Sequence, residues 1–97
     1  MFIVQVIFES EKDNIERIKA IMEKKKSDAA EADENLLSYE LWWKEGTNTV
    51  GFSMVTKWAN KESFKKWMKE THKDGHKKAS EGSPIVNKTV YQFESIE

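Results

Sequence analysis

The sequence predicts one α+β domain in which four strands and two helices follow one another in the order βαββαβ. Three observations support this class. Apolar and polar residues alternate in four segments, a period of two that is typical of β-strands. In two other segments apolar residues recur every three or four positions, as they do on one side of an amphipathic helix. The 97 residues suffice for one hydrophobic core but not for two, so we expect residues 1–97 to form a single domain.

The composition favours a soluble globular protein and argues against a nucleic-acid partner. Apolar residues make up 38% of the chain and charged residues 34%, which is not the composition of a disordered chain. Sixteen Lys and Arg stand against 17 Asp and Glu, whereas a general nucleic-acid binder needs an excess of cations. The absence of cysteine excludes disulfides and thiolate metal sites. Neither a membrane-spanning run nor a signal-peptide pattern is present, so we expect no membrane partner and a cytoplasmic location.

The first strand is expected over residues 1–9. One side of it is wholly apolar, with Phe2, Val4, Val6 and Phe8, and the other is mixed, with Ile3, Gln5, Ile7 and Glu9. The first side should therefore meet the core. Ser10 is the predicted N-cap of the helix that follows, with Asp13 in its first turn. The apolar stripe of this helix consists of Ile15, Ile18, Ile21 and Met22, and we expect the helix to weaken after Lys26.

Two alternating segments, residues 36–44 and 50–58, predict a β-hairpin because only a short connection, with a turn at residues 45–48, separates them. Gly46 in this turn permits a positive φ. In the first of these strands we assign to the core the positions Leu37, Tyr39, Leu41 and Trp43. In the second, the core positions are Val50, Phe52, Met54 and Trp58.

A second helix is predicted to begin after Asn60, a good N-cap, with Glu62 in its first turn. Its apolar stripe is Phe64, Trp67 and Met68. After a segment interrupted by Gly75, Gly82 and Pro84, residues 85–93 form the last strand.

These elements build a ferredoxin-like antiparallel sheet with both helices on one face, because right-handed crossovers place them on the same side. The opposite face then keeps apolar side chains, which we assign to Ile3, Leu36, Trp42 and Val55. An apolar face of this kind usually marks an interface, so the sequence predicts a homodimer.

Candidate chemistry is concentrated after the second helix. The two histidines, His72 and His76, are i,i+4 neighbours if the helix continues. Such a pair can hold a metal, but without a nearby third ligand it is equally compatible with polar residues at a helix end. Trp43 and Trp58 share the apolar side of their strands and are expected in the core, whereas the stripe of Trp67 leads into the histidine segment. No nucleophile–base pair, phosphate-binding loop or paired-carboxylate motif occurs.

The C-terminal half carries a recognisable succession of residues. A strand ends at Trp58, a helix begins after Asn60 and contains Phe64 and Trp67, and a polar segment ends at His76. The sequence SPIVN at residues 83–87 then leads into the last strand. This succession resembles the antibiotic-biosynthesis-monooxygenase (ABM) superfamily and, within it, the IsdG-type haem-degrading monooxygenases.

The resemblance implies a dimeric α+β barrel with one pocket per subunit, between the sheet and the second helix. It implies that His76 is the axial ligand of haem iron and that Trp67 presses on the porphyrin. His72 is the substitute ligand, because one residue fewer separates Trp67 from His76 than in the family. IsdG-type proteins also have an asparagine on the first strand, where this sequence offers only the amide of Gln5, which is the candidate to line the same pocket as Trp67 and Phe64. Haem binding is therefore better supported than haem degradation.

Two classes of function follow. The first is an enzyme: a haem-binding monooxygenase, with an electron donor if it degrades haem, or a cofactor-free monooxygenase acting on a quinol-like aromatic substrate. Trp67, Phe64 and Phe8 suit a flat macrocycle, and its propionates would pair with Lys73, Lys77 or Lys78. The second class is a non-catalytic dimer that binds a small ligand with the same fold. The missing asparagine favours this second class, whereas Trp67 and His76 favour the first.

Overall fold

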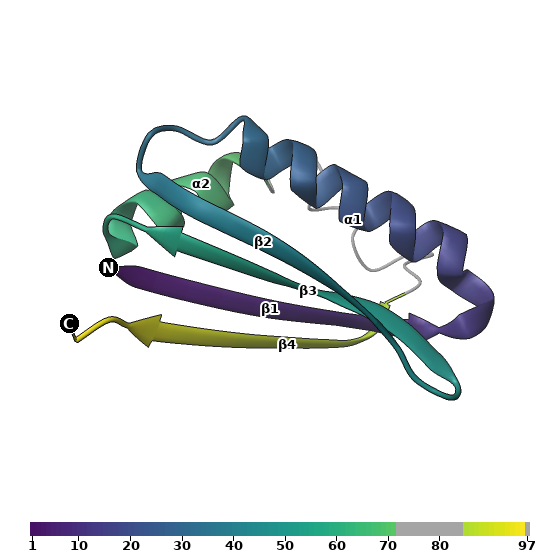
Figure 1. The fold of residues 1–97 in the computed structure, drawn as a ribbon. Helices are drawn as coiled ribbons and strands as arrows, with labels where there is room; N and C mark the ends of the chain where they lie inside the picture. Colours follow the sequence, from purple (N-terminus) through teal and green to yellow (C-terminus); the bar gives the residue numbers. More distant parts are fainter. Residues whose placement is uncertain (72–84, 97) are drawn as a thin grey trace.

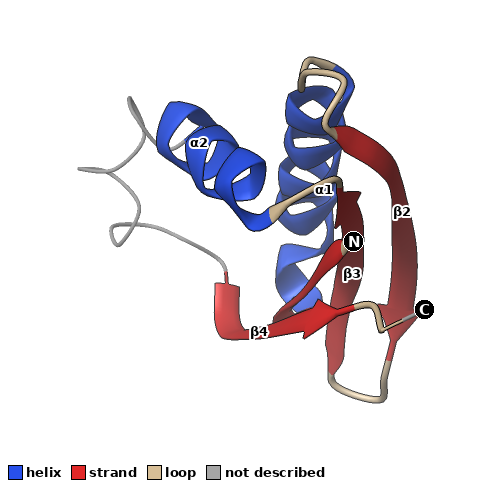
Figure 2. Ribbon diagram, turned by 90° about the vertical axis from the view of Figure 1, so that its left-hand side faces the viewer, coloured by secondary structure: helices blue, strands red, loops and turns tan. Residues whose placement is uncertain are grey.

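The sheet and its two helices follow the predicted order. A computed structural model describes residues 1–71 and 85–96. The elements are β1 (Phe2–Glu11), the 3-10 turn η1 (Lys12–Asn14), α1 (Ile15–Ala30), β2 (Leu36–Glu45), β3 (Thr49–Trp58), α2 (Lys61–Thr71) and β4 (Ile85–Glu94). The strands form one antiparallel sheet in the order β2-β3-β1-β4. Both helices cover the same face of this sheet, as Figure 1 and Figure 2 show. Among the described helices, none has the length and apolar character needed to span a membrane.

The junction between β1 and α1 differs from the prediction. Ser10 does not cap a helix. It is fully buried within β1, opposite Val50 of β3, so the strand is longer than expected and the chain enters α1 through η1. The helix also continues beyond Lys26 to Ala30. Ala29 is buried against the core, and tertiary packing of this kind stabilises a helix end more than local propensity does.

The core lies between the sheet and the helices. Its strand residues alternate along β1 and β3, which confirms the predicted apolar sides of both strands. The buried side chains of this layer are Phe2, Val4, Phe8, Val50, Phe52, Met54 and Trp58 from the sheet, Ile18 and Ala29 from α1, and Phe64 from α2.

Strand β2 departs from the prediction at its start. An irregularity between Leu36 and Ser38 shifts the alternation by one residue, so Leu36 packs against the core. Leu37, predicted to be in the core, is 54% exposed instead. Beyond the irregularity Tyr39, Leu41 and Trp43 face the core as expected, but they are only partly buried because β2 is an edge strand.

The second face of the sheet carries no helix. Its alternating positions include Ile3 and Ile7 of β1, Val55 of β3, and three large residues that are about half exposed, namely Trp42, Tyr91 and Phe93. The predicted apolar character of this face is confirmed for Ile3, Trp42 and Val55, and wrong for Leu36.

Gly51 provides a test of the strand pairing. A Cβ atom at this position would collide with the backbone carbonyl oxygen of Phe8 on the neighbouring strand, and two paired backbones cannot separate without losing hydrogen bonds. We expect Gly51→Ala to lower the free energy of unfolding by at least about 2 kcal/mol, measured by urea denaturation.

Gly46→Ala is the matched control. Its φ lies outside the left-handed region. The one tight contact of the added Cβ would be with Oγ1 of Thr49 at 3.1 Å, which can rotate away, and the Thr49 backbone oxygen lies at an ordinary contact distance of 3.6 Å. We expect a loss below about 1 kcal/mol. Equal losses for the two variants would contradict the close approach of β1 and β3.

Candidate functional site

An apolar cavity of about 60 Å³ lies between the sheet and α2. Every strand except β2 contributes to its walls, and α2 closes it with three side chains. The described lining residues are Val4, Val6 and Phe8 of β1, Met54 and Thr56 of β3, Val90 of β4, Phe64, Trp67 and Met68 of α2, and two lysines, Lys25 and Lys88. Apolar and aromatic walls with a few polar groups are typical of small-molecule sites.

The start of α2 fixes the direction of its aromatic side chains. The Ser63 backbone N–H donates to Oδ1 of Asn60 at 2.9 Å, which confirms the predicted N-cap. One turn later Phe64 is buried, with its ring 5.8 Å from that of Trp58 and 5.7 Å from that of Phe2. These contacts hold the stripe of α2 against the sheet.

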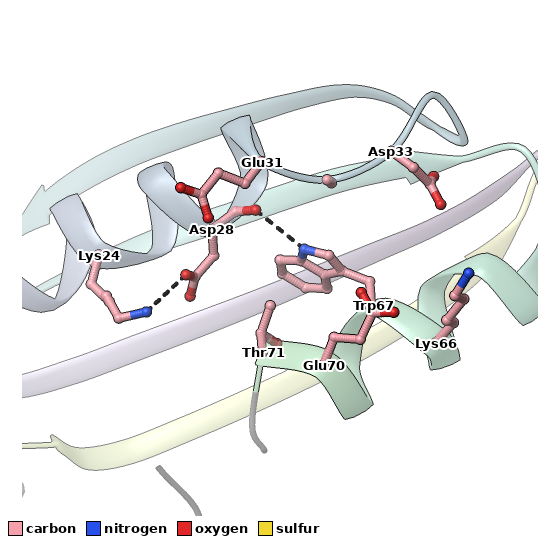
Figure 3. A pocket seen from close by; sticks show the side chains of 9 residues that line it. Lys24, Asp28, Glu31, Asp33, Lys66, Trp67, Glu70 and Thr71 are labelled. Atoms are coloured by element: carbon pink, nitrogen blue, oxygen red, sulfur yellow. Dashed lines mark hydrogen bonds and ion pairs between the residues drawn. The ribbon is translucent and has the colours of Figure 1, made fainter. Parts of the chain in front are cut away.

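Trp67 lies between two pockets. Its ring is 5.3 Å from that of Trp58, and its Nε1–H donates to the backbone oxygen of Asp28 at 3.3 Å, which joins α2 to the end of α1. On the inner side it lines the apolar cavity. On the outer side it borders an open, polar pocket of about 680 Å³ together with residues such as Glu31 and Glu70 (Figure 3). Trp67 therefore separates an apolar space from a solvated one.

Two lysines stand at the cavity over the same aromatic ring. Lys25 of α1 places its Nζ 5.6 Å from the centre of the Phe8 ring, and Lys88 of β4 places its Nζ 5.7 Å from it. Burial lowers the pKa of Lys25, and repulsion by Lys88 lowers it further, while Asp28 acts in the opposite direction. The site therefore concentrates positive charge beside an apolar space.

Sequence reasoning missed both lysines, although the sequence contains a signal for each. Lys25 follows Ile18, Ile21 and Met22 at helical spacing, which puts it on the stripe that faces the sheet. Lys88 lies directly opposite Phe8 in the β1–β4 register, but that register is not visible in the sequence alone.

The structure does not bring Gln5 together with Trp67 and Phe64. Successive side chains of a strand point to opposite faces, and Gln5 lies on the face without helices, where its Nε2 donates to Oγ of Ser53 at 3.0 Å. The expectation that Gln5 lines the same pocket as Trp67 is therefore corrected. His72 and His76 lie outside the described residues, as do Lys73, Lys77 and Lys78. Within the described part of the chain, no cluster of three His, Asp or Glu residues is arranged to bind a metal ion.

Comparison with solved structures identifies the fold. No protein-family model matches the sequence, and no curated protein is significantly similar to it. A candidate antibiotic biosynthesis monooxygenase from Deinococcus radiodurans matches with a TM-score of 0.80 at 11% identity, over 100% of this chain and 94% of that chain. This chain has the ABM fold.

Other proteins with the ABM fold differ in their chemistry. MhuD, a haem degrader from Mycobacterium tuberculosis with two haems bound in its active site, matches with a TM-score of 0.61 at 15% identity, over 98% of this chain and 96% of that one. SnoaB, a cofactor-independent oxygenase from Streptomyces nogalater, matches with a TM-score of 0.71 at 9% identity, over 99% and 94%. The ABM fold thus supports oxygenases with and without haem, and fold alone does not choose between them.

The two tryptophans near the cavity should respond differently to truncation. Trp67→Phe keeps most of the ring and removes one partly exposed hydrogen bond, so we expect a loss of about 1 kcal/mol in the free energy of unfolding. Trp58 is 1% exposed and its Nε1–H donates to the buried Oγ1 of Thr56. Trp58→Phe should therefore cost about 2 kcal/mol or more, because it leaves both a void and an unpaired hydroxyl. Denaturation of both variants tests the order, and a larger loss for Trp67→Phe would contradict it.

Proposed function

We propose that this protein binds haem in the cavity beneath α2 and acts as a haem-binding monooxygenase. The observation that carries the proposal is the apolar, aromatic cavity on the helix that leads into the histidine segment. A porphyrin needs flat apolar walls, which Trp67, Phe64 and Phe8 supply. Its propionates need cations, and Lys25 and Lys88 lie at the same cavity. The side chains at this cavity are therefore of the types that a haem site needs.

The cavity has to widen to admit a macrocycle, because about 60 Å³ corresponds to the volume of only about two liquid water molecules. The side chain that can move is Trp67. It is half-buried, and the open pocket of about 680 Å³ on its outer side offers space into which it can rotate. The movement would break its hydrogen bond to the Asp28 backbone oxygen, at a net cost of about 1 kcal/mol.

The residues at the proposed haem site have different roles. Haem, when bound, supplies oxygen activation at its iron. His76 would coordinate this iron, with His72 as the substitute. Trp67 and Phe64 contact the macrocycle and exclude water from it. Because Gln5 faces the other side of the sheet, no described amide from β1 reaches this cavity, which favours haem binding over degradation.

The small cavity volume supports a second candidate, a cofactor-free monooxygenase on a quinol-like aromatic substrate. One or two aromatic rings require less widening than a porphyrin does. If neither haem nor an aromatic substrate is turned over, a non-catalytic ligand-binding dimer is the remaining alternative.

Haem titration followed by absorption spectroscopy tests the proposal. We expect a Soret band with a histidine-ligated spectrum for the wild-type protein and for His72→Ala. His76→Ala should lose this spectrum, because it removes the imidazole that is proposed to coordinate the iron.

The opposite pattern would move the ligand to His72. If the wild-type protein takes up no haem, the haem proposal is refuted and turnover of a quinol-like substrate becomes the measurement to make. Decay of the Soret band on adding a reductant in air would indicate degradation, and a stable band would indicate binding only.

We also propose that a second copy of the chain covers the sheet face without helices, giving the dimeric α+β barrel. Trp42, Tyr91 and Phe93 are about half exposed there, around the pair formed by Gln5 and Ser53. A partly apolar surface with a polar pair at its centre suits a self-complementary two-fold interface.

Trp42→Glu tests this interface, because Trp42 is 50% exposed in one chain and its replacement leaves the core between sheet and helices intact. We expect light scattering at micromolar concentration to report a dimer for the wild type and a monomer for the variant. Ala30→Glu, at an exposed position of α1 on the other side of the sheet, is the control and should remain dimeric. A wild-type mass of one chain would refute the dimer.

A further inference from the structure

We infer that the cavity beneath α2 selects flat apolar ligands that carry an acidic group, and that this group is held between the ammonium groups of Lys25 and Lys88. The inference rests on the proposed ligand-binding function and names the chemical class that this site prefers. It applies equally to a porphyrin carboxylate and to a small aromatic acid.

The geometry places both cations near the same aromatic ring. Phe8 is 4% exposed and its ring stacks on that of Phe52 with centroids 4.8 Å apart, so the core fixes its position. Lys88 approaches this ring from the neighbouring strand and Lys25 approaches it from α1, each to within 6 Å of the ring centre. Both also line the cavity. An acidic group attached to a ligand in the cavity would therefore meet two donors from two different elements.

Neither cation has an acidic partner in residues 1–71 and 85–96. The four ion pairs found there join Lys24 to Asp28, Lys44 to Glu9, Lys19 to Glu16, and the N-terminus to Glu94. Two neighbouring lysines of α1 illustrate the difference. A hydrogen bond to Asp28 raises the pKa of Lys24, whereas burial and Lys88 lower the pKa of Lys25. Lys25 thus has no ion-pair partner among the described residues and lies beside a low-dielectric space, where an anion has the strongest effect.

A bound acid should reverse the shift in the pKa of Lys25. In the ligand-free protein, burial lowers this pKa most, Lys88 of β4 and Lys24 of α1 lower it further, and Asp28 on the same helix opposes them. A carboxylate between the lysines favours the charged form and raises the pKa. Binding is therefore coupled to proton uptake, and affinity for an acid should fall as the pH rises through the pKa of Lys25, which lies below the ordinary lysine value of 10.5.

The experiment compares two probes of equal size, 2-naphthoate and its neutral counterpart 2-naphthylmethanol, by isothermal titration calorimetry at pH 7. For the wild-type protein we expect naphthoate to bind about tenfold more tightly, as a charge-assisted interaction allows. The double variant Lys25→Gln/Lys88→Gln should bind both probes equally, with little change for the alcohol. Lys24→Gln is the matched control, one residue away on α1, and should keep the preference for the acid.

A second double variant separates the effect of charge from that of packing. Lys25→Arg/Lys88→Arg retains both charges and should retain the preference, whereas loss of the preference in this variant would overturn the inference. Equal binding of the two probes to the wild type, or a preference that survives in the double glutamine variant, would also overturn it while leaving ligand binding in the cavity intact. If neither naphthalene probe nor haem binds to the wild type, the proposed function fails together with the inference.

Discussion

The packing of Trp58, Phe64 and Trp67 determines where the site can be. Phe64 and Trp67 both contact Trp58 through their rings, and Trp58 is the last residue of β3. The chain therefore turns from strand to helix directly beside the residue that the helix packs on. Phe64 is the one buried residue of α2, and Trp67 and Met68 pack beside it against the same cluster. The aromatic cluster, with the hydrogen bond from Trp67 to the end of α1, fixes α2 over the sheet and leaves the cavity beneath it.

Much of the fold followed from periodicity. The apolar sides of β1 and β3 were predictable because both strands are central, and one side of each is buried under the helices along its whole length. The start of α2 was predictable because Asn60 caps it locally. Leu36 and Leu37 were assigned to the wrong faces because an irregularity in the β2–β3 pairing changes the alternation, and pairing between strands leaves no mark on the sequence of either strand. Ser10 was misassigned because its burial against Val50 outweighs its capping propensity.

The candidate site was predictable only in part. Phe64 and Trp67 were identified through helical spacing and resemblance, and the structure brings them to one cavity. Gln5 was assigned by chemical type, although the alternation of β1 already placed it opposite Val4 and Val6. Lys25 and Lys88 were missed because charged residues are usually exposed, and their shared position over Phe8 depends on three elements that are far apart in the sequence.

The two pockets on either side of Trp67 differ in net charge, so an anion is favoured on one side only. The described residues around the outer pocket include four carboxylates, from Asp28, Glu31, Asp33 and Glu70, and two lysines. The inner cavity has the opposite balance, because Lys25 and Lys88 are its only described charged lining residues. An anion that approaches α2 is thus repelled on the outer side and attracted beside β4. Val90, the apolar lining residue of β4, is 48% exposed, so the cavity wall reaches solvent on the side where the positive charge lies. One edge of the site therefore combines exposed apolar surface with two cations that have no ion-pair partner among the described residues, and this combination suits an acidic aromatic ligand better than a neutral or a basic one.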